Sequence, residues 1–294
     1  MKPQLSLGQC ATLACLLEAA APKPGNVHRG ADFEDLTFID LAASAVLIGP
    51  ALERAAQGGR LGPVVLSGVQ AAKAAARSNT HLGTVLLMAP LALAWEEIGS
   101  SPAVARAAVG RVLQSLDARD AALVYQAIRL AGAGGLGEAA EADLAGTPPD
   151  DLLHAMRLAE ERDLVARQYA RGFAELFDQV VPWLLDGLHK AWPLADAIVH
   201  AHVQLMHAHP DSLIARKCGR QAAEHAAALA GYVLSCGIPA DPAYRAALLE
   251  LDFWLRADGH RRNPGTTADM LAAGLFVLLG SGAVAPPFDF YPGL

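Results

Sequence analysis

Apolar residues recur at helical spacing along almost the whole chain, and this periodicity excludes most folds other than a bundle of helices. The clearest stripes are carried by Val109, Val112, Leu113 and Leu116; by Phe173, Leu176, Phe177 and Val180, continuing through Leu184 and Leu188; and by Ala247, Leu251, Trp254 and Leu255. Sustained apolar–polar alternation, the period of a half-buried strand, is absent. A strand fits only short runs such as Pro63 to Val69. The pattern predicts a single compact all-α domain over residues 1–294, with about ten or more helices.

The composition supports a large helical core. Hydrophobic residues make up 53% of the 294 residues and charged residues 18%, which argues against disorder. Aromatic residues are only 6%, as suits closely packed, alanine-rich helices. The formal net charge of -7 argues against binding a nucleic-acid backbone through bulk positive charge, although a local cluster of Lys and Arg can still bind a nucleotide.

The cysteines and the first residues favour a cytoplasmic protein. None of the four cysteines forms a C-x-x-C pair, so they are interpreted as reduced thiols. MKPQLSLGQC at the start lacks the long apolar core of a signal peptide. The charge-free run from Met270 to Phe288 is broken by glycines and prolines and is short of the roughly 20 apolar residues that a membrane span needs, so it predicts a buried helix.

Several helix boundaries are visible in the sequence. Ser6 and Gln9 have the spacing of a capping box, and Asp241 before Pro242 resembles an N-cap with proline at the first helical position. Asp150, after two prolines, is a further predicted start. The glycine-rich segment 131–151 is predicted to be a linker or plain loop, with a lid over a site as the alternative.

Four polar segments interrupt the apolar helices, and they are the candidates for function. The first is PKPGNVHRG, Pro22 to Gly30, followed by Asp32, Glu34 and Asp35; the second is SNTHLG, Ser78 to Gly83; the third is HPDSLIARKCG, His209 to Gly219; the fourth is RRNPGTTADM, Arg261 to Met270. Each alone is typical of a turn or a helix cap. Each also places polar or cationic side chains beside a glycine and next to a predicted helix start.

This combination favours a phosphate-binding site. Helix N-termini expose unpaired N–H groups and partial positive charge, and glycine lets the backbone approach a ligand. Cations that could neutralise a polyphosphate are Lys23, Arg29, Arg216, Lys217, Arg261 and Arg262. Asp32, Asp35 and Asp211 are predicted Mg²⁺ ligands, because Mg²⁺ prefers oxygen and often links carboxylates to substrate phosphates.

Other common sites are not supported. The Walker pattern G-x-x-x-x-G-K-[ST] is absent, and the glycine-rich stretch near Gly134 lacks the preceding strand of a dinucleotide-binding fingerprint. The histidines of HAHVQLMHAHP stand two helical turns apart rather than at metal-binding spacing, so a helix end lining a cleft is favoured over a metal site. No Ser-His-Asp arrangement can be argued from spacing.

Taken in order, the four polar segments resemble the motifs of the triphosphoribosyl-dephospho-CoA synthase family. APKPGNVH at Ala21 to His28 is similar to the family's TPKPGLVD, and NTHLG at Asn79 to Gly83 to its NTHKG. DSLIARKCG at Asp211 to Gly219 echoes D-T-N-L-x-x-R-G-G, and NPGTTADML at Asn263 to Leu271 echoes SPGGSADLL. The resemblance covers Glu18 to Leu279.

The resemblance implies an all-α transferase that moves a triphosphoribosyl group from ATP to the 2′-hydroxyl of dephospho-CoA, releases adenine and makes a prosthetic-group precursor. Asp35 and Asp211 are then candidates for metal binding or ribose stabilisation, and Lys23, Arg216 and Lys217 for holding phosphates. The full set of residues expected to bind substrate or phosphate is Lys23, Gly25, Asn26, His28, Arg29, Asn79, Thr80, His81, Gly83, Ser212, Arg216, Lys217, Asn263, Gly265, Thr266 and Thr267. Mg²⁺ is expected with ATP, and neither a nucleic acid nor a membrane is an expected partner.

The chain also departs from the family motifs. Leu82 replaces the lysine of NTHKG, and Gly265-Thr266-Thr267 replaces Gly-Gly-Ser. These changes favour, as an alternative, a sister group that uses another acceptor in cofactor biosynthesis, for example that of a methanopterin or methanofuran type carrier. A non-catalytic helical scaffold is the third hypothesis, and a homo-oligomer is compatible with all three. The transferase hypothesis predicts that the four segments meet, and that charge reversal at Lys23 abolishes nucleotide binding with little effect on stability.

Overall fold

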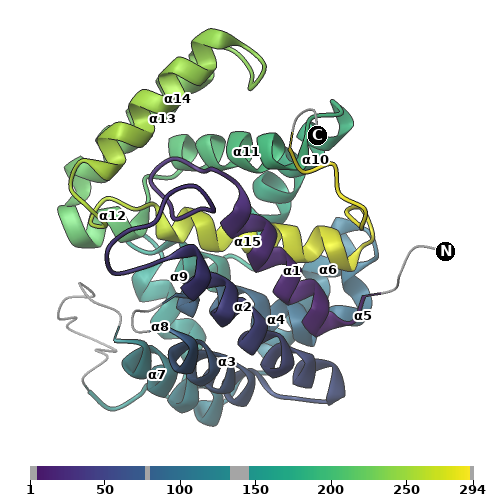
Figure 1. Ribbon diagram of the computed structural model, residues 1–294. Helices are drawn as coiled ribbons and strands as arrows, with labels where there is room; N and C mark the ends of the chain where they lie inside the picture. The colour runs from purple at the N-terminus through teal and green to yellow at the C-terminus, as the bar shows by residue number, and fades with distance from the viewer. Residues whose placement is uncertain (1–4, 77–79, 133–145, 292–294) are drawn as a thin grey trace.

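The computed structural model describes residues 5–76, 80–132 and 146–291, and these form helices and connecting loops (Figure 1). The α-helices are α1 (Leu7–Ala20), α2 (Phe38–Glu53), α3 (Leu61–Ala75), α4 (Leu82–Leu93), α5 (Trp95–Ile98), α6 (Pro102–Gln114), α7 (Ala118–Ala131), α8 (Leu152–Ala159), α9 (Leu164–Ala170), α10 (Val181–His189), α11 (Leu194–Ala208), α12 (Ser212–Cys218), α13 (Arg220–Ser235), α14 (Pro242–Arg256) and α15 (Gly265–Gly280). A 3₁₀ turn η1 (Arg54–Gln57) follows α2, and a π-helical turn η2 (Leu176–Val180) precedes α10.

The all-α prediction is confirmed. Within the described ranges no strand forms, and the only ladder-type pairing is an isolated bridge between His28 and Ala31. The run from Pro63 to Val69, the best candidate for a strand, lies inside α3. The segment 131–151 falls largely outside the described residues, since 133–145 are not included.

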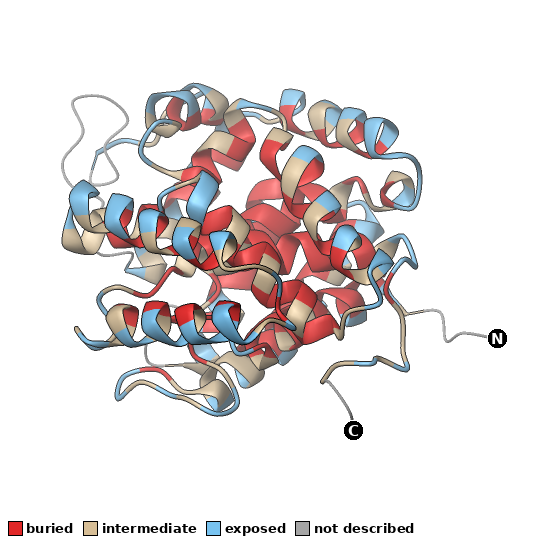
Figure 2. Ribbon diagram, turned by 90° about the horizontal axis from the view of Figure 1, so that it is seen from above, coloured by how far each residue is buried: buried red, intermediate tan, exposed pale blue. Residues whose placement is uncertain are grey.

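Helix α15 is the centre of the main core. It carries an almost unbroken series of buried residues from Met270 to Leu279 and packs against α1, α4, α10 and α11. Figure 2 shows the buried residues concentrated on the helices in the middle of the molecule. The charge-free run is therefore a buried helix, as predicted. Across the described ranges, every helix is too short or too polar to cross a membrane.

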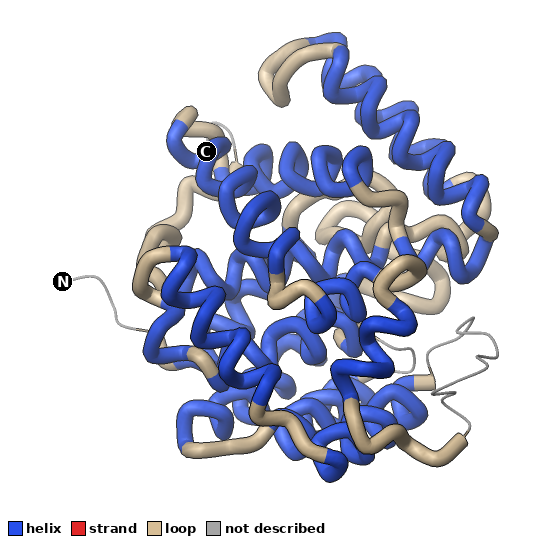
Figure 3. The backbone as a smooth tube through the Cα atoms, turned by 180° about the vertical axis from the view of Figure 1, so that it is seen from behind, coloured by secondary structure: helices blue, strands red, loops and turns tan. Residues whose placement is uncertain are grey.

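A second, smaller core joins the helices at one end of the molecule. Val203 and Met206 of α11 pack with Ile214 of α12 and with the inner faces of α13 and α14. The α13–α14 hairpin projects from the rest of the molecule, as Figures 1 and 3 show from opposite sides. Asp211, just before α12, and the loop after α14 connect this core to the N-terminus of α15.

The predicted helix starts are correct to within one residue. Ser6 and Gln9 form a capping box at α1, and Pro242 opens α14 after Asp241. The cap of α8 is Asp151 rather than Asp150, and its side chain accepts from His154 N. The stripe from Phe173 to Leu188 is not one regular helix, because Phe173 has a φ of 59° and a π-turn precedes α10.

Candidate active site at the start of helix α15

The first turns of α15 bring parts of all four polar segments together. Asp269 accepts a hydrogen bond of 2.5 Å from Thr84 Oγ1, beside the second segment. Thr267 is bonded to Asp211 of the third segment. The backbone of Gly25, in the first segment, lies against Pro264 so closely that a Cβ there would stand 2.9 Å from the proline Cδ. The predicted meeting of the segments is therefore present in the structure.

Asp211 joins two helix N-termini. Its Oδ1 accepts from Leu213 N and Ile214 N at 2.8 and 3.0 Å, which caps α12. Its Oδ2 accepts from the N–H and the hydroxyl of Thr267, both at 2.8 Å, at the start of α15. Burial raises the pKa of Asp211 despite these donors. Because four protein donors already occupy the carboxylate, this geometry fits a positioning role and differs from the metal-binding and ribose-stabilising roles expected from the sequence.

Lys23 lies inside the protein rather than on a cleft wall. Its side chain is fully buried, its ammonium pairs with Glu18 Oε1 at 2.9 Å, and it also donates to the carbonyl oxygens of Glu18 and Ala21. The sequence-based expectation of a phosphate clamp does not fit this placement, because the cation is already neutralised. Its structural role is to tie the end of α1 to the loop that follows.

The PKPG turn is held from α14. Gly25 adopts a φ of 73°, which favours glycine, and its N–H donates to Asp252 Oδ1 at 2.7 Å. Asp252 also pairs with Arg256 at 2.8 Å, and Arg256 donates to the carbonyl oxygen of Asn26. These contacts explain why the first helix stops at Ala20: the irregular loop is anchored to the second core.

The second segment presents neutral polar groups. Burial lowers the pKa of His81 to about 4, so its imidazole is uncharged at neutral pH. His81 Nδ1 lies 2.8 Å from Ser44 Oγ, which is 2.8 Å from Thr80 Oγ1. Asn79, also predicted to bind substrate, lies outside the described residues. Gly83 lies against Asp269, where a Cβ would stand 2.0 Å from Oδ2 and so no side chain fits.

Lys217 is the cation closest to the expected phosphate role. It is half-buried, and its Nζ makes only long contacts of 3.4 Å, with the His260 carbonyl and with Asn263 Oδ1. Burial lowers the pKa of Lys217, while Asp35 acts in the opposite direction. Asp35 itself accepts from His260 Nδ1 at 2.9 Å. The third, fourth and first segments therefore meet at Lys217 as well.

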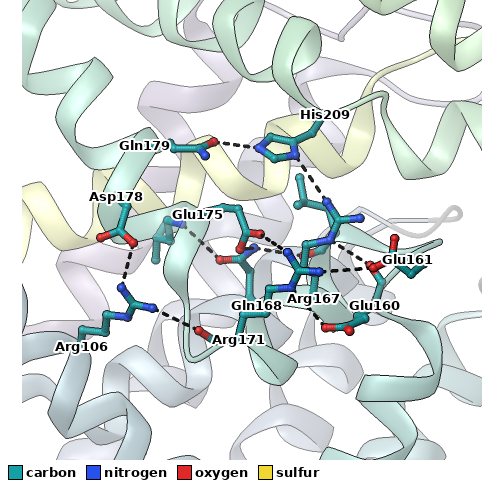
Figure 4. Close-up of polar contacts among 12 residues, drawn as sticks. Arg106, Glu160, Glu161, Arg167, Gln168, Arg171, Glu175, Asp178, Gln179 and His209 are labelled. Carbon is teal, nitrogen blue, oxygen red and sulfur yellow. Dashed lines mark hydrogen bonds and ion pairs between the residues drawn. The ribbon is translucent and has the colours of Figure 1, made fainter.

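Arg216 and His209 take part in a polar network that ties the third segment to neighbouring helices. Arg216 pairs with Asp163, the N-cap of α9, and Ser212 accepts from Leu164 N at 2.9 Å. His209, at the end of α11, lies 2.8 Å from Gln179 and 3.4 Å from Arg167, as Figure 4 shows. The network fixes the third segment against α9 and η2. Arg216, expected to bind phosphate directly, is partly committed to this support.

The remaining predicted residues lie nearer the surface. Arg29 is exposed and stacks over the ring of Tyr291 at 4.8 Å, and His28 Nδ1 accepts from Gly30 N at 3.1 Å. Asp32 caps the start of α2 by accepting from Phe38 N at 2.7 Å. In the part of the chain that the structure describes, no three His, Cys, Asp or Glu side chains are placed to hold a metal ion. Asp32, Asp35 and Asp211 are thus not gathered into the predicted metal site.

Two buried side chains beside the first segment have polar atoms without a hydrogen-bond partner. Both ring nitrogens of His202, on α11, lack one, and so does Asn26 Oδ1. Burial and the charge of Lys23 lower the pKa of His202, so the ring is neutral. Buried polar atoms without partners are rare, and local strain, a catalytic role or a bound water or ion accounts for them. The HAHVQLMHAHP helix therefore contributes His202 to this region.

Sequence reasoning missed three residues that the structure adds: Glu18, His202 and Asp269. Asp269 lies within the fourth motif, NPGTTADML, but was interpreted as part of a helix start. Its signal was its position, because a carboxylate in the first turns of a predicted buried helix needs a partner or a function. Glu18 carried a similar signal, as a single acidic residue in the otherwise apolar α1.

The comparisons with known proteins agree with one another. A family model described as ATP:dephospho-CoA triphosphoribosyl transferase (CitG) matches residues 4–285. A crystal structure from Archaeoglobus fulgidus, described as a "putative triphosphoribosyl-dephospho-coA synthase", is similar with a TM-score of 0.63 and 28% sequence identity, covering 82% of this chain and 98% of that one. A search of curated proteins finds no match.

Proposed function

Because the chain belongs to the ATP:dephospho-CoA triphosphoribosyl transferase family, we propose that it transfers the triphosphoribosyl group of ATP to dephospho-CoA and releases adenine. The observation that carries this proposal is the meeting of four polar segments at the start of α15, where carboxylates, hydroxyls and a half-buried lysine face one region. A triphosphate that must stay intact needs cations and hydrogen-bond donors, whereas the ribose needs negative charge nearby as adenine leaves.

The region provides both kinds of group. Lys217, with its long contacts, can turn to a phosphate at little cost, and the N–H groups that begin α15 add partial positive charge. On the side of Thr84, Asp269 supplies a carboxylate, whereas the charge of Glu18 is already paired with Lys23. A developing positive charge on the ribose would be stabilised on that side. The triphosphate of ATP would thus meet positive charge, and the ribose carbon that loses adenine would meet negative charge.

We propose that Mg²⁺ enters with ATP as part of the substrate, since the described residues form no cluster that would hold the ion alone. The exposed carboxylate of Asp35, 61% accessible and close to Lys217, is suited to meet such a complex through oxygen atoms. We also place the protein in the cytoplasm, in keeping with its four free cysteines.

One observation favours a second candidate, the same transfer to another acceptor. Leu82, which stands where the family motif has lysine, packs its side chain against the main core, so a charge is lost beside the site. An acceptor with fewer phosphates than dephospho-CoA would suit this change.

The test is incubation of the purified protein with ATP, Mg²⁺ and dephospho-CoA, followed by chromatography for adenine and mass spectrometry of the acceptor. Adenine in equal amount to triphosphoribosyl-dephospho-CoA is expected. ATP binding without adenine release would favour the other acceptor. Failure to bind ATP at all would leave the scaffold hypothesis.

A further inference from the structure

We propose that Asp269 is the general base of the reaction, accepting the proton of the attacking hydroxyl; this inference rests on the proposed function. Asp269 lies on the second turn of α15, against Gly83 and Thr84 at the start of α4. The residue as a whole is partly exposed, while its carboxyl group is buried enough for desolvation to raise its pKa.

The carboxyl group of Asp269 is fixed in place by α4. Thr84 Oγ1 donates to Oδ1 at 2.5 Å. The other oxygen, Oδ2, lies directly against Gly83. A Cβ added to Gly83 would stand only 2.0 Å from this oxygen. A base must lie within hydrogen-bond reach of the proton that it takes, and a fixed carboxyl group meets that condition at no further ordering cost.

The neighbouring carboxylates are committed to other partners. Glu18 pairs with buried Lys23 at 2.9 Å. Asp211 accepts four hydrogen bonds, from Leu213, Ile214 and both donors of Thr267. Among the contacts that the described residues make with it, Asp269 has neither a paired cation nor four donors, so its oxygens are less engaged than those of Glu18 and Asp211.

The titratable groups around Asp269 favour a base that works near neutral pH. Burial raises the pKa of Asp269 to about 7, Thr84 opposes this, and the charges of Glu18 and Asp211 add to it. Cys15 of α1 also faces this carboxyl group, with a thiol whose pKa burial raises, and Lys23 and His202 lie behind Glu18. A base is most effective when its pKa lies close to the working pH.

The step balances without any further reactant. The acceptor O–H bond breaks, its proton passes to Asp269 Oδ2, and the oxygen lone pair forms the new bond to C1′ of the ATP ribose. The C1′–N9 bond breaks and its electron pair leaves with adenine, which takes up a proton from solvent. Asp269 later returns its proton to solvent, so no oxidant or reductant is required.

The experiment compares kcat/KM against pH for the wild type and three variants, with MgATP and dephospho-CoA. The wild type should lose activity below about pH 7, since the base must be unprotonated. Asp269→Asn should lower kcat by about 100-fold or more and remove this acidic limb, while ATP binding measured by calorimetry persists. Thr84→Val, which deletes the donor that lowers the pKa of Asp269, should move the limb to higher pH.

Asp196→Asn is the matched control. Asp196 is a half-buried carboxylate near the start of α11 whose pKa is also raised by burial, but it faces Arg245 rather than the polar segments. Its variant should keep the wild-type rate and profile.

The outcomes separate the two proposals. A wild type that binds ATP but releases no adenine refutes the proposed function, and the role of Asp269 with it. An active wild type beside an Asp269→Asn variant that keeps its rate within about threefold and its acidic limb refutes the base alone.

Discussion

At the residue scale, the side chain of Lys23 is buried and pairs with Glu18 at 2.9 Å, inside the protein rather than on a cleft wall. A fully buried ion pair is held by both partners, and removal of one leaves a desolvated charge. This placement favours a loss of stability on charge reversal at Lys23, in contrast to the small effect expected from the sequence.

Lys23→Met should lower the free energy of unfolding by about 3–5 kcal/mol, because Glu18 is left buried and unpaired. Lys23→Met combined with Glu18→Gln should recover much of the loss, since both charges are gone. Urea unfolding followed by circular dichroism measures both variants. Unchanged stability of Lys23→Met together with lost ATP binding would restore the phosphate role.

Asp269 predicts how stability responds to pH. Its folded pKa, about 7, lies above the value of 3.8 for an exposed carboxyl group. Between these values the folded state binds the proton more tightly, so this residue makes the protein less stable as pH rises from about 4 to 7. Asp269→Asn removes that loss. The thermal midpoint of the variant minus that of the wild type should therefore be a few degrees larger at pH 8 than at pH 5. A constant difference across this range would contradict the raised pKa.

At the element scale, the sequence predicted helices well because their causes are local. The capping box of Ser6 and Gln9 and the proline after Asp241 act within one turn. The failures came where a distant group overrode the local pattern. The stripe breaks at Phe173 because Gly172 and Phe173 have positive φ angles, and the side chain of buried Gln168 accepts from Leu176 N in the first turn that follows.

Asp211 is the element-scale link between α12 and α15. Asp211→Ala should cost roughly 3 kcal/mol or more, because four buried donors lose their acceptor at once. Asp151→Ala, which removes an ordinary N-cap bond at α8, is the comparison and should cost about 1 kcal/mol. Equal losses in chemical denaturation would mean that Asp211 is only another helix cap.

At the scale of the whole molecule, the motif order indicated that the segments meet, but not what holds them. The PKPG loop is anchored by Asp252 and Arg256 of α14, a helix whose sequence shows only an amphipathic stripe. Such contacts join residues more than two hundred positions apart in the chain. Nothing local to Asp252 marks it as a partner of Gly25, which is why packing between the two cores lay beyond sequence reasoning.

This arrangement predicts that substrate binding slows hydrogen exchange in the projecting α13–α14 hairpin. Helix α14 packs mainly on α13, and the smaller core has far fewer buried residues than the main core, so amides of α13 and α14 should exchange with deuterium faster than those of α15. ATP held by the first and fourth segments would restrict the motion of Gly25 and of the loop after α14. Because Asp252 and Arg256 bind the first segment, the end of α14 would become less mobile as well. Hydrogen-exchange mass spectrometry with and without MgATP should show slower exchange around Asp252 to Arg256, with helix α7 as the unaffected reference. Protection confined to α15, with α14 unchanged, would show that the hairpin is only a support for the fold and does not respond to the occupied site.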